Sequence, residues 1–438
     1  MSLKYETVSL GEHLYIKGRI GWKGLKKDEY LDYGNYRIIN ATALEEDGIN
    51  WNDCGYITKE RFDESPEIIL KEKDILISKD GTIGKLGYVK ELHVPSTVAS
   101  GVFVVRNLNK EYIDTDFLYY YFKSPFFKWF IKSVTEGSVI PHLYQRDFID
   151  MEFNLFDLKV QKKCSTILNA LEEKININKR INKNLEEIAQ SFLNENFFIF
   201  SKYSEDQLMD TDIGKIPINW KIYKLNELFN HIKPGTNYQP KRVEKGIPFL
   251  NVKNINSGFI DLSDVKYISL EDFKKVHKTW MPEENDILIS RIGTLGLTTI
   301  IDKDDLPLAV HYNFINIKSN RLPYQFIYFL FKSNNFQRKY HTIKKYSVQE
   351  YVTIDDFSEI EIALHNNLNE LQSQFKLFVN LFDKIQENIL EIKKLQKLRD
   401  ILLPKLMSGE IDVSQINCDL KIIIKFILNP LNYFYGGI

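Results

Sequence analysis

The sequence lacks the motifs of the familiar enzyme classes. It contains no Gly-x-Ser-x-Gly, no His-Glu-x-x-His and no dinucleotide-binding fingerprint, and its eight histidines do not cluster. Its three cysteines, Cys54, Cys164 and Cys418, lie far apart and form no metal-ligand pattern. These absences predict a chain with no metal site and no cofactor of its own. The cysteine usage fits a reducing cytoplasm.

An excess of charge of one sign and long apolar runs are also missing. The net charge is −1, so no field of the whole chain attracts nucleic acid, and any such site must be a local patch. The N-terminus has no apolar signal core. The apolar terminal stretch Ile422–Tyr435 contains Lys425 and Pro430 and is too short to span a bilayer. We therefore expect a cytoplasmic protein that does not enter a membrane.

The composition does provide enough apolar surface for several packed domains. Hydrophobic residues make up 44% of the 438 residues and charged residues 27%, which is ordinary for a globular protein and excludes a mostly disordered chain. At about 150 residues per domain, this length allows roughly three units, or two units with connectors.

The most informative feature is an internal repeat. Asp74-Ile-Leu-Ile-Ser78 recurs as Asp286-Ile-Leu-Ile-Ser290, followed in both places by a Gly-Thr-x-Gly turn, and 8 of the 11 residues are identical. Phe117-Leu-Tyr-Tyr-Tyr-Phe-Lys-Ser124 likewise matches Phe326-Ile-Tyr-Phe-Leu-Phe-Lys-Ser333. Small changes in the displacement are loop-length changes. The chain is therefore two copies of one unit of about 210 residues.

Each copy begins with a mixed part and ends with a helical part. Short β-branched or apolar runs bounded by Gly, Asp or Asn predict strands, and a helix-like segment follows near Asp116–Lys123. In the second copy a heptad stripe predicts a coiled-coil seam, formed by Leu371, Phe375, Phe378, Phe382, Ile385, Ile389 and Ile392. The displaced positions in the first copy are Val160, Cys164, Ile167, Leu171 and Ile181, with a polar interruption at Lys174 and Asn178.

Two seams of this length need a partner, and the simplest partner of each helix is the other. The sequence therefore predicts an α/β (α+β) architecture in which two similar heads are joined by two long antiparallel coiled-coil helices, related by a pseudo-two-fold axis. In the alternative, each helix merely covers its own head. Two similar heads at a fixed separation suit a DNA target with two half-sites, because half-site spacing mirrors the geometry of the protein.

Local charge gives a second reason to expect a polyanion partner. No acidic residue occurs from Leu306 to Gln349, whereas lysines, arginines and aromatic residues are frequent there, and the cluster Arg338–Lys345 is the most basic part. The corresponding region of the first copy is less basic. The paired Gly-Thr-x-Gly turns are the other candidate, since glycines allow backbone N–H groups to approach phosphates closely. A plain tight turn between two strands is the alternative.

The chain also resembles a known family, the DNA-specificity subunits of type I restriction-modification systems. The resemblance covers about residues 1 to 415. It is carried by Ile216-Pro217-Ile-Asn-Trp220, by the repeated Asp-Ile-Leu-Ile-Ser turn and, most specifically, by Leu402-Leu-Pro-Lys-Leu-Met-Ser-Gly-Glu-Ile411. It implies two target-recognition domains that each read half of a bipartite DNA sequence, with a helical spacer that fixes the gap.

The resemblance further implies that this chain is not catalytic. It would recruit two methyltransferase subunits that use S-adenosylmethionine to methylate adenine, and restriction subunits that use ATP and Mg to translocate along DNA and cleave it. The expected divisions are the first recognition domain, the first spacer helix, the second recognition domain, the second spacer helix and an atypical tail, at residues 1–155, 156–202, 203–363, 364–412 and 413–438.

Basic and amide side chains on the loops of each head are the candidate DNA contacts, because Arg pairs with guanine and Gln with adenine in the major groove. They are Lys79, Lys85, Gln145 and Arg146 in the first head, and Lys241, Arg242, Arg291, Lys344, Lys345 and Gln349 in the second. A rival class is a structural coiled-coil adaptor that binds no DNA. A self-contained restriction-modification enzyme does not fit, because the repeat occupies both halves of the chain.

Overall fold

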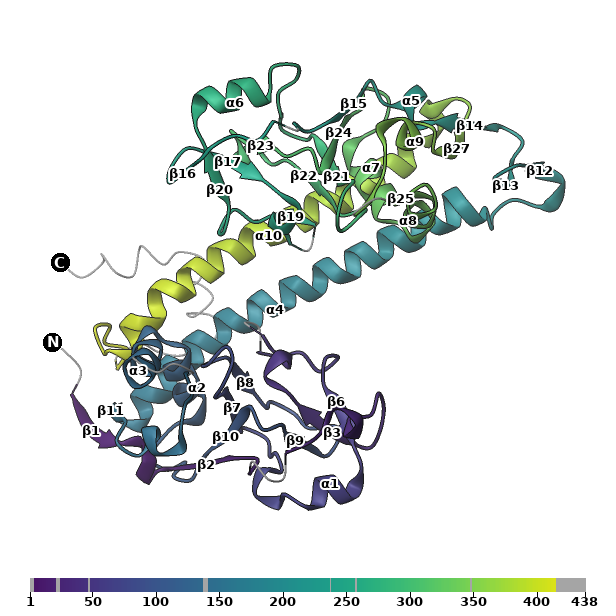
Figure 1. Cartoon of the computed structure of the whole chain (residues 1–438). Helices are drawn as coiled ribbons and strands as arrows, with labels where there is room; N and C mark the ends of the chain where they lie inside the picture. Colours follow the sequence, from purple (N-terminus) through teal and green to yellow (C-terminus); the bar gives the residue numbers. More distant parts are fainter. Residues whose placement is uncertain are drawn as a thin grey trace. The chain divides into compact units, whose positions relative to one another are not determined.

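The computed structural model describes residues 4–20, 24–45, 48–136, 141–236, 238–256, 258–346 and 349–414 (Figure 1). Most of the tail expected at 413–438 lies outside the described residues. The chain forms two compact units, one made of the residues up to Ile177 together with those from Glu391 on, and the other of Asn178–Leu390. Each unit holds the mixed part of one copy of the repeat, and each long helix is divided between the two units.

The strands and short helices of the first unit follow one another in the order of the repeat. The strands are β1 (Tyr5–Ser9), β2 (Leu14–Gly18), β3 (Tyr36–Ile39), β4 (Leu44–Glu45), β5 (Gly48–Ile49), β6 (Gly55–Ile57), β7 (Ile75–Ser78), β8 (Leu86–Tyr88), β9 (Ser96–Val98), β10 (Val102–Asn107) and β11 (Glu152–Phe156). The helices are α1 (Lys59–Asp63), α2 (Thr115–Lys123) and α3 (Pro125–Thr135).

The second unit repeats this series and adds a hairpin at its start. Its strands are β12 (Leu208–Thr211), β13 (Gly214–Pro217), β14 (Trp220–Lys224), β15 (His231–Pro234), β16 (Arg242–Val243), β17 (Ile247–Leu250), β18 (Ile255–Asn256), β19 (Phe259–Ile260), β20 (Lys266–Ile268), β21 (Ile287–Ser290), β22 (Thr298–Ile300), β23 (Ala309–Val310), β24 (Phe314–Lys318), β25 (Lys345–Tyr346), β26 (Glu350–Tyr351) and β27 (Glu361–His365). Its helices are α5 (Leu225–Leu228), α6 (Leu270–Val276), α7 (Tyr324–Lys332), α8 (Asn334–Thr342) and α9 (Ile354–Ser358).

Sheet topology shows that the two copies share one fold. The central sheet has the order β2-β10-β7-β8 in the first unit and β15-β24-β21-β22 in the second. A smaller sheet, β6-β3-β9, corresponds to β16-β20-β17-β23, which has one more strand. The first and last strands of each copy also pair, β1 with β11 and β14 with β27. The predicted duplicated α+β fold is therefore confirmed.

A long helix follows the last strand of each copy. Helix α4 (Leu158–Asn194) has 37 residues, and α10 (Gln372–Met407) has 36. The two helices run antiparallel within each unit: in the first, Lys163 pairs with Ser414 and Lys174 with Glu391, and in the second Asn182 pairs with Asn388. No helix in the described ranges combines the length and the apolar character that a membrane span requires.

Both helices also form part of the core of each head. In the first unit, Ile167 and Leu171 of α4 share one apolar cluster with Phe117 of α2 and Leu402 of α10. In the second, Phe378 of α10 packs between Phe197 and Phe329, with ring centroids 6.1 and 5.8 Å away. Of the predicted seam, Val160, Cys164, Ile167, Leu171, Leu371, Phe375, Phe378, Phe382, Ile385 and Ile392 are buried, and Ile389 is half-buried.

The predicted position of Ile181 in the seam is wrong. Its side chain is 38% exposed, and Asn182, one residue further, forms the contact with α10 instead. The strict heptad spacing ends after Leu171, because the next buried residue is Ile175 rather than Lys174. Ile175 follows Leu171 by four residues, where the heptad repeat would place the next apolar residue three residues on. With this longer step the apolar stripe follows the 3.6-residue period of a straight helix and leaves the heptad register.

Candidate nucleic-acid interface

The repeated Asp-Ile-Leu-Ile-Ser motif forms the central strand β7 in one unit and β21 in the other. Asp74 is fully buried at the start of β7, where its carboxylate accepts hydrogen bonds from Nε and Nη2 of Arg106, both at 2.7 Å. Asp286 occupies the same place in β21, with Lys318 Nζ at 3.3 Å and the side-chain amide of Asn316 at 2.9 Å. The aspartate therefore holds neighbouring strands together in both copies and has a structural role.

The serine that ends each strand closes the Gly-Thr-x-Gly turn. Ser78 Oγ donates to the carbonyl of Thr82 at 2.6 Å and accepts from the N–H of Lys85 at 2.8 Å, while the N–H of Gly84 donates to the carbonyl of Ser78. Ser290 makes the same bonds in the second unit. The N–H groups of Gly84 and Lys85 are therefore engaged within the turn and are not available to a phosphate. The structure favours the alternative of a plain turn between two strands.

The last glycine of each turn lies against a helix. Gly84 and Gly296 have φ angles of +83° and +80°, a region that favours glycine. A Cβ at Gly84 would lie 2.4 Å from Ile131 Cδ1 of α3, and one at Gly296 would lie 2.1 Å from Gln337 Oε1 of α8. Glycine at this position therefore lets α3 and α8 pack directly on the turn.

A second segment runs beside each turn. The N–H of Leu143 donates to the carbonyl of Lys79 at 2.9 Å, and that of Val352 donates to the carbonyl of Arg291 at the same distance. Lys79, Gln145 and Arg146 therefore lie along one edge of the first unit, with Lys85 at the far end of the same turn. In the second unit the hairpin β25–β26 places Lys344, Lys345 and Gln349 near Arg291. Lys241 and Arg242 lie elsewhere, at the edge strand β16.

In the first head the candidate cations form no ion pair with a carboxylate of the described residues. Lys79 is half-buried with Nζ 5.0 Å from the centre of the Phe103 ring, and burial lowers the pKa of its ammonium group. Lys85 is half-buried, whereas Gln145 and Arg146 are exposed. The Arg146 guanidinium lies 4.9 Å from the centre of the Tyr144 ring. These three cations are therefore the candidates in the first head whose charge a polyanion could meet.

In the second head several predicted cations are already paired. Lys344 Nζ lies 2.9 Å from Glu350, and Lys345 Nζ lies 2.6 Å from Asp356. Both carboxylates follow the stretch from Leu306 to Gln349 that contains no acidic residue. The fold places them next to the two lysines. Arg291 donates Nε to the carbonyl of Val352 at 2.9 Å, and burial lowers its pKa. The basic cluster is thus less available for phosphates than its sequence suggests.

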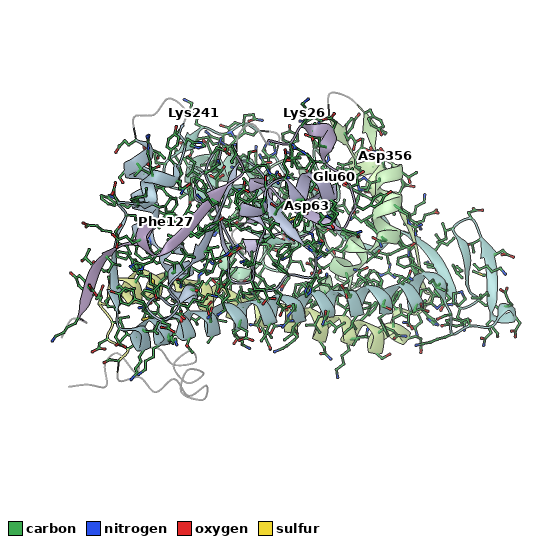
Figure 2. The ribbon with its side chains drawn as sticks, turned by 90° about the horizontal axis from the view of Figure 1, so that it is seen from below. Lys26, Glu60, Asp63, Phe127, Lys241 and Asp356 are labelled. Carbon is green, nitrogen blue, oxygen red and sulfur yellow. The ribbon has the colours of Figure 1, made fainter. Side chains whose placement is uncertain are left out.

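Lys241 and Arg242 are exposed candidates of the second head with no ion pair to a described carboxylate. Lys241 lies on the side of its unit opposite α4 and α10 (Figure 2). The guanidinium of Arg242 lies 4.5 Å from the centre of the ring of Phe249, which is buried. Sequence reasoning missed the ring partners Tyr144 and Phe249, although an aromatic residue two positions before Arg146 was a visible signal. No group of His, Cys, Asp and Glu that could hold a metal ion occurs within the described ranges.

A family model described as the type I restriction modification DNA specificity domain matches residues 3–187 and 217–398. The chain belongs to this family. The two matched regions correspond to the two copies of the repeat, and each includes the turn and the neighbouring segment described above. Ile216 and Trp220, which carried part of the resemblance, are buried at the entry to the second region, and the Trp220 ring packs against Phe200 at 4.9 Å.

Named relatives extend over most of the chain. The type I restriction enzyme MjaVIII specificity subunit of Methanocaldococcus jannaschii is 25% identical over 94% of this chain and 94% of its own length. The MjaIX specificity subunit of the same organism is 27% identical over 92% of this chain and 89% of its own. The chain is therefore a specificity subunit of a type I restriction-modification system, a DNA-recognition component rather than a catalytic one.

A solved structure shows the same fold. The S subunit of the type I restriction-modification system from M. genitalium superposes with a TM-score of 0.56 at 16% identity, covering 92% of this chain and 96% of that one. The likeness supports the duplicated arrangement of strands and long helices.

Proposed function

We propose that this specificity subunit reads a bipartite DNA sequence, one half-site with each unit. The observation that carries the proposal is the duplication of one edge, formed by the Gly-Thr-x-Gly turn and the segment hydrogen-bonded beside it. Because the surrounding side chains differ between the copies, the two half-sites would have different sequences. Contacts to phosphates would set the register, and contacts to base edges would set the sequence.

The candidate DNA contacts differ in whether their charged group already forms an ion pair. Lys79, Lys85, Arg146, Lys241 and Arg242 have no carboxylate of the described residues within ion-pairing distance, so they are the first to test. Lys344 and Lys345 would have to exchange a carboxylate for a phosphate. Arg291 keeps its half-buried backbone contact, and Gln145 and Gln349 are exposed amides that suit adenine.

The long helices would set the gap between the half-sites. Each helix continues without a break from one unit into the other, so its length is shared by both heads. A continuous helix is stiff on this scale and rises about 1.5 Å per residue. The number of residues between the heads would therefore fix how many base pairs are left unread.

Partner subunits would supply the chemistry. Methyltransferase subunits would bring S-adenosylmethionine for adenine methylation, and restriction subunits would bring ATP and Mg for translocation and cleavage. The outer face of α4 offers a docking surface, since Ile181 and Ile188 are 38% and 52% exposed one heptad apart.

A binding selection tests the proposal. The complex of this chain with its methyltransferase subunit is incubated with a pool of randomised duplexes, and the bound DNA is sequenced. We expect one split sequence with a constant unread gap, enriched only when this chain is present. Binding should weaken steeply as salt rises, because phosphate contacts release counterions. A folded complex that enriches no sequence would contradict the proposal and favour the structural adaptor.

A further inference from the structure

Two arginines differ from the other arginines that lie over aromatic rings of described residues. Arg37 donates to the hydroxyl of Tyr56, Arg106 is held by Asp74, and Arg321 donates to the carbonyl of Glu227. The guanidinium groups of Arg146 and Arg242 are exposed and make no hydrogen bond or ion pair with described residues. Each therefore keeps its donors available while one face of the group is covered.

Arg146 lies in a short stack of side chains at the first head. Its guanidinium is 4.9 Å from the centre of the Tyr144 ring, and the His142 ring lies 4.6 Å from that of Tyr144. The nearest carboxylate in sequence, Asp147, accepts the N–H of Tyr144 at 2.6 Å and so caps the backbone turn. Asp147 and Arg146 form no ion pair with each other.

Arg242 is supported differently at the second head. It lies on the edge strand β16, which pairs with β20, and its guanidinium covers the ring of Phe249 from β17. The imidazole of His311 packs against the same ring at 5.3 Å. The ring and the two strands fix where this guanidinium points, whereas a lysine at this place would have no such plane to rest on.

The two arginines do not occupy equivalent places of the repeat. In the first head Leu31 forms a β-bridge with Tyr56, and in the second head Val243 pairs with Tyr267, so Leu31 and Val243 are equivalent. The residue before each of them is Tyr30 in the first head and Arg242 in the second. Leu143 and Val352 each donate their N–H to the turn of their own head, so these two residues are equivalent. The third residue after each of them is Arg146 in the first head and Asp355 in the second. Each head therefore has one ring-supported guanidinium that makes no hydrogen bond or ion pair with described residues, and the two heads present it from different elements.

We propose that Arg146 and Arg242 are the guanine-reading residues of the two heads, each recognising one guanine of its own half-site. The inference rests on the proposed function and specifies the base that each unit reads. A guanidinium can donate two parallel hydrogen bonds to O6 and N7 of guanine in the major groove. A planar group already held against a ring loses less rotamer freedom on binding than a free side chain. Tyr144 and Phe249 are positioning residues.

A contact to a base and a contact to a phosphate respond differently when the arginine is replaced by lysine. A phosphate contact needs a positive charge and survives Arg→Lys, whereas the two parallel bonds to guanine need the planar fork. Lys241, beside Arg242, has no ring and no carboxylate partner among the described residues, so it is the matched control for a phosphate contact.

The test is the binding selection repeated with the variants R146Q, R146K, R242Q, R242K and K241Q in complex with the methyltransferase subunit. The wild-type chain should select a guanine in each half-site. R242Q and R242K should lower the preference for one guanine of one half-site about 10- to 100-fold and leave the other half-site unchanged. R146Q and R146K should do the same in the other half-site. K241Q should weaken binding to all sequences equally.

Tyr144 provides a test of positioning. Y144F keeps the ring and should keep the preference for guanine, whereas Y144A should reduce it as R146K does. A wild-type half-site without guanine, or an unchanged preference in R146Q or R242Q, would overturn the inference while leaving the proposed function intact. A wild-type complex that selects no sequence would overturn both. Both arginines are exposed, and circular dichroism checks that each variant is folded.

Discussion

Arg106 donates two hydrogen bonds to the buried carboxylate of Asp74, each 2.7 Å long. The pair joins β10 to the start of β7, and Lys318 and Asp286 stand in the same places of the second copy. Removing one partner of a buried ion pair costs about 3–5 kcal/mol, because the other charge stays buried without a counter-ion. We therefore predict that R106M lowers the free energy of unfolding of the first unit by that amount.

Urea unfolding followed by circular dichroism measures this loss. The control is K59M, since Lys59 pairs with Asp63 on the surface, where an ion pair contributes at most about 1 kcal/mol. If R106M and K59M have the same small effect, then Asp74 is not the structural centre of the repeated motif.

His277 predicts a dependence of stability on pH in the second unit. Its Nε2 accepts the N–H of Val310 at 3.1 Å, Nδ1 lies 3.2 Å from the carbonyl of Trp280, and burial lowers the pKa to about 4. The folded state thus favours the neutral ring. This contribution is complete above the ordinary pKa of 6.5 and is lost as the pH falls from 6.5 to about 4.

The loss at His277 should reach about 3 kcal/mol, since each pKa unit corresponds to about 1.4 kcal/mol. Urea midpoints measured between pH 7.5 and 4.5 should fall for the wild-type chain. In H277Q this pH dependence should be weaker, whereas in H93Q, a change at an exposed histidine, it should remain. An equal slope in H277Q and the wild-type chain would exclude His277 as its source.

A polar pair lies between the long helices of the second unit. The side-chain amide of Asn388, which is buried, donates to Asn182 Oδ1 at 2.7 Å, and Asn182 donates to the carbonyl of Ile385. N388L should destabilise the unit by about 1–3 kcal/mol, because the half-buried Asn182 loses its donor. The double variant N182L/N388L should recover most of that loss, since no polar group is then left unpaired.

A double-mutant cycle in urea measures this coupling between Asn182 and Asn388. Losses that simply add would show that the two amides do not act as a pair. A recovered stability together with a broader binding preference for the gap length would indicate that the pair fixes the register of the helices.

Helix length offers a prediction about the DNA gap. Seven residues inserted after Ile177 in α4, matched by seven before Glu391 in α10, lengthen both helices by about 10 Å. At about 3.4 Å per base pair, the selected gap should grow by about three base pairs with unchanged half-sites. An insertion in α4 alone is the control, because it offsets the pairing of the helices and should abolish selection. An unaltered gap in the matched variant would contradict the ruler.

Sequence patterns predicted the parts of the fold that depend on period and repetition. The apolar stripe from Leu371 into α10 as far as Ile392 was visible because apolar residues face one side of a helix wherever it packs. The residues of α4 that face the seam were not all visible in this way. Their positions were copied from the spacing of α10, and that spacing lacks the four-residue step from Leu171 to Ile175. The pairing of Asp74 with Arg106 was also hidden, because residues far apart in sequence meet only in the folded sheet.

The sequence named candidate DNA contacts, but it could not show what surrounds them in the fold. The repeated turn pointed to an edge that both heads share. Its serine binds the N–H groups of Gly84 and Lys85 in the first head, and of Gly296 and Leu297 in the second. The charges counted along the sequence could not show that Glu350 forms an ion pair with Lys344 and Asp356 with Lys345. The rings under Arg146 and Arg242 came from the structure, since Phe249 belongs to a different strand from Arg242.

The central claim is that this chain gives a methyltransferase a split DNA target, one half-site per unit. The most direct measurement is the mapping of methyladenine in plasmid DNA from cells that express the methyltransferase subunit with and without this chain. We predict methyladenine in one motif of two half-sites with a constant gap, lost entirely when this chain is omitted. A contiguous motif, or methylation that persists without this chain, would contradict the claim.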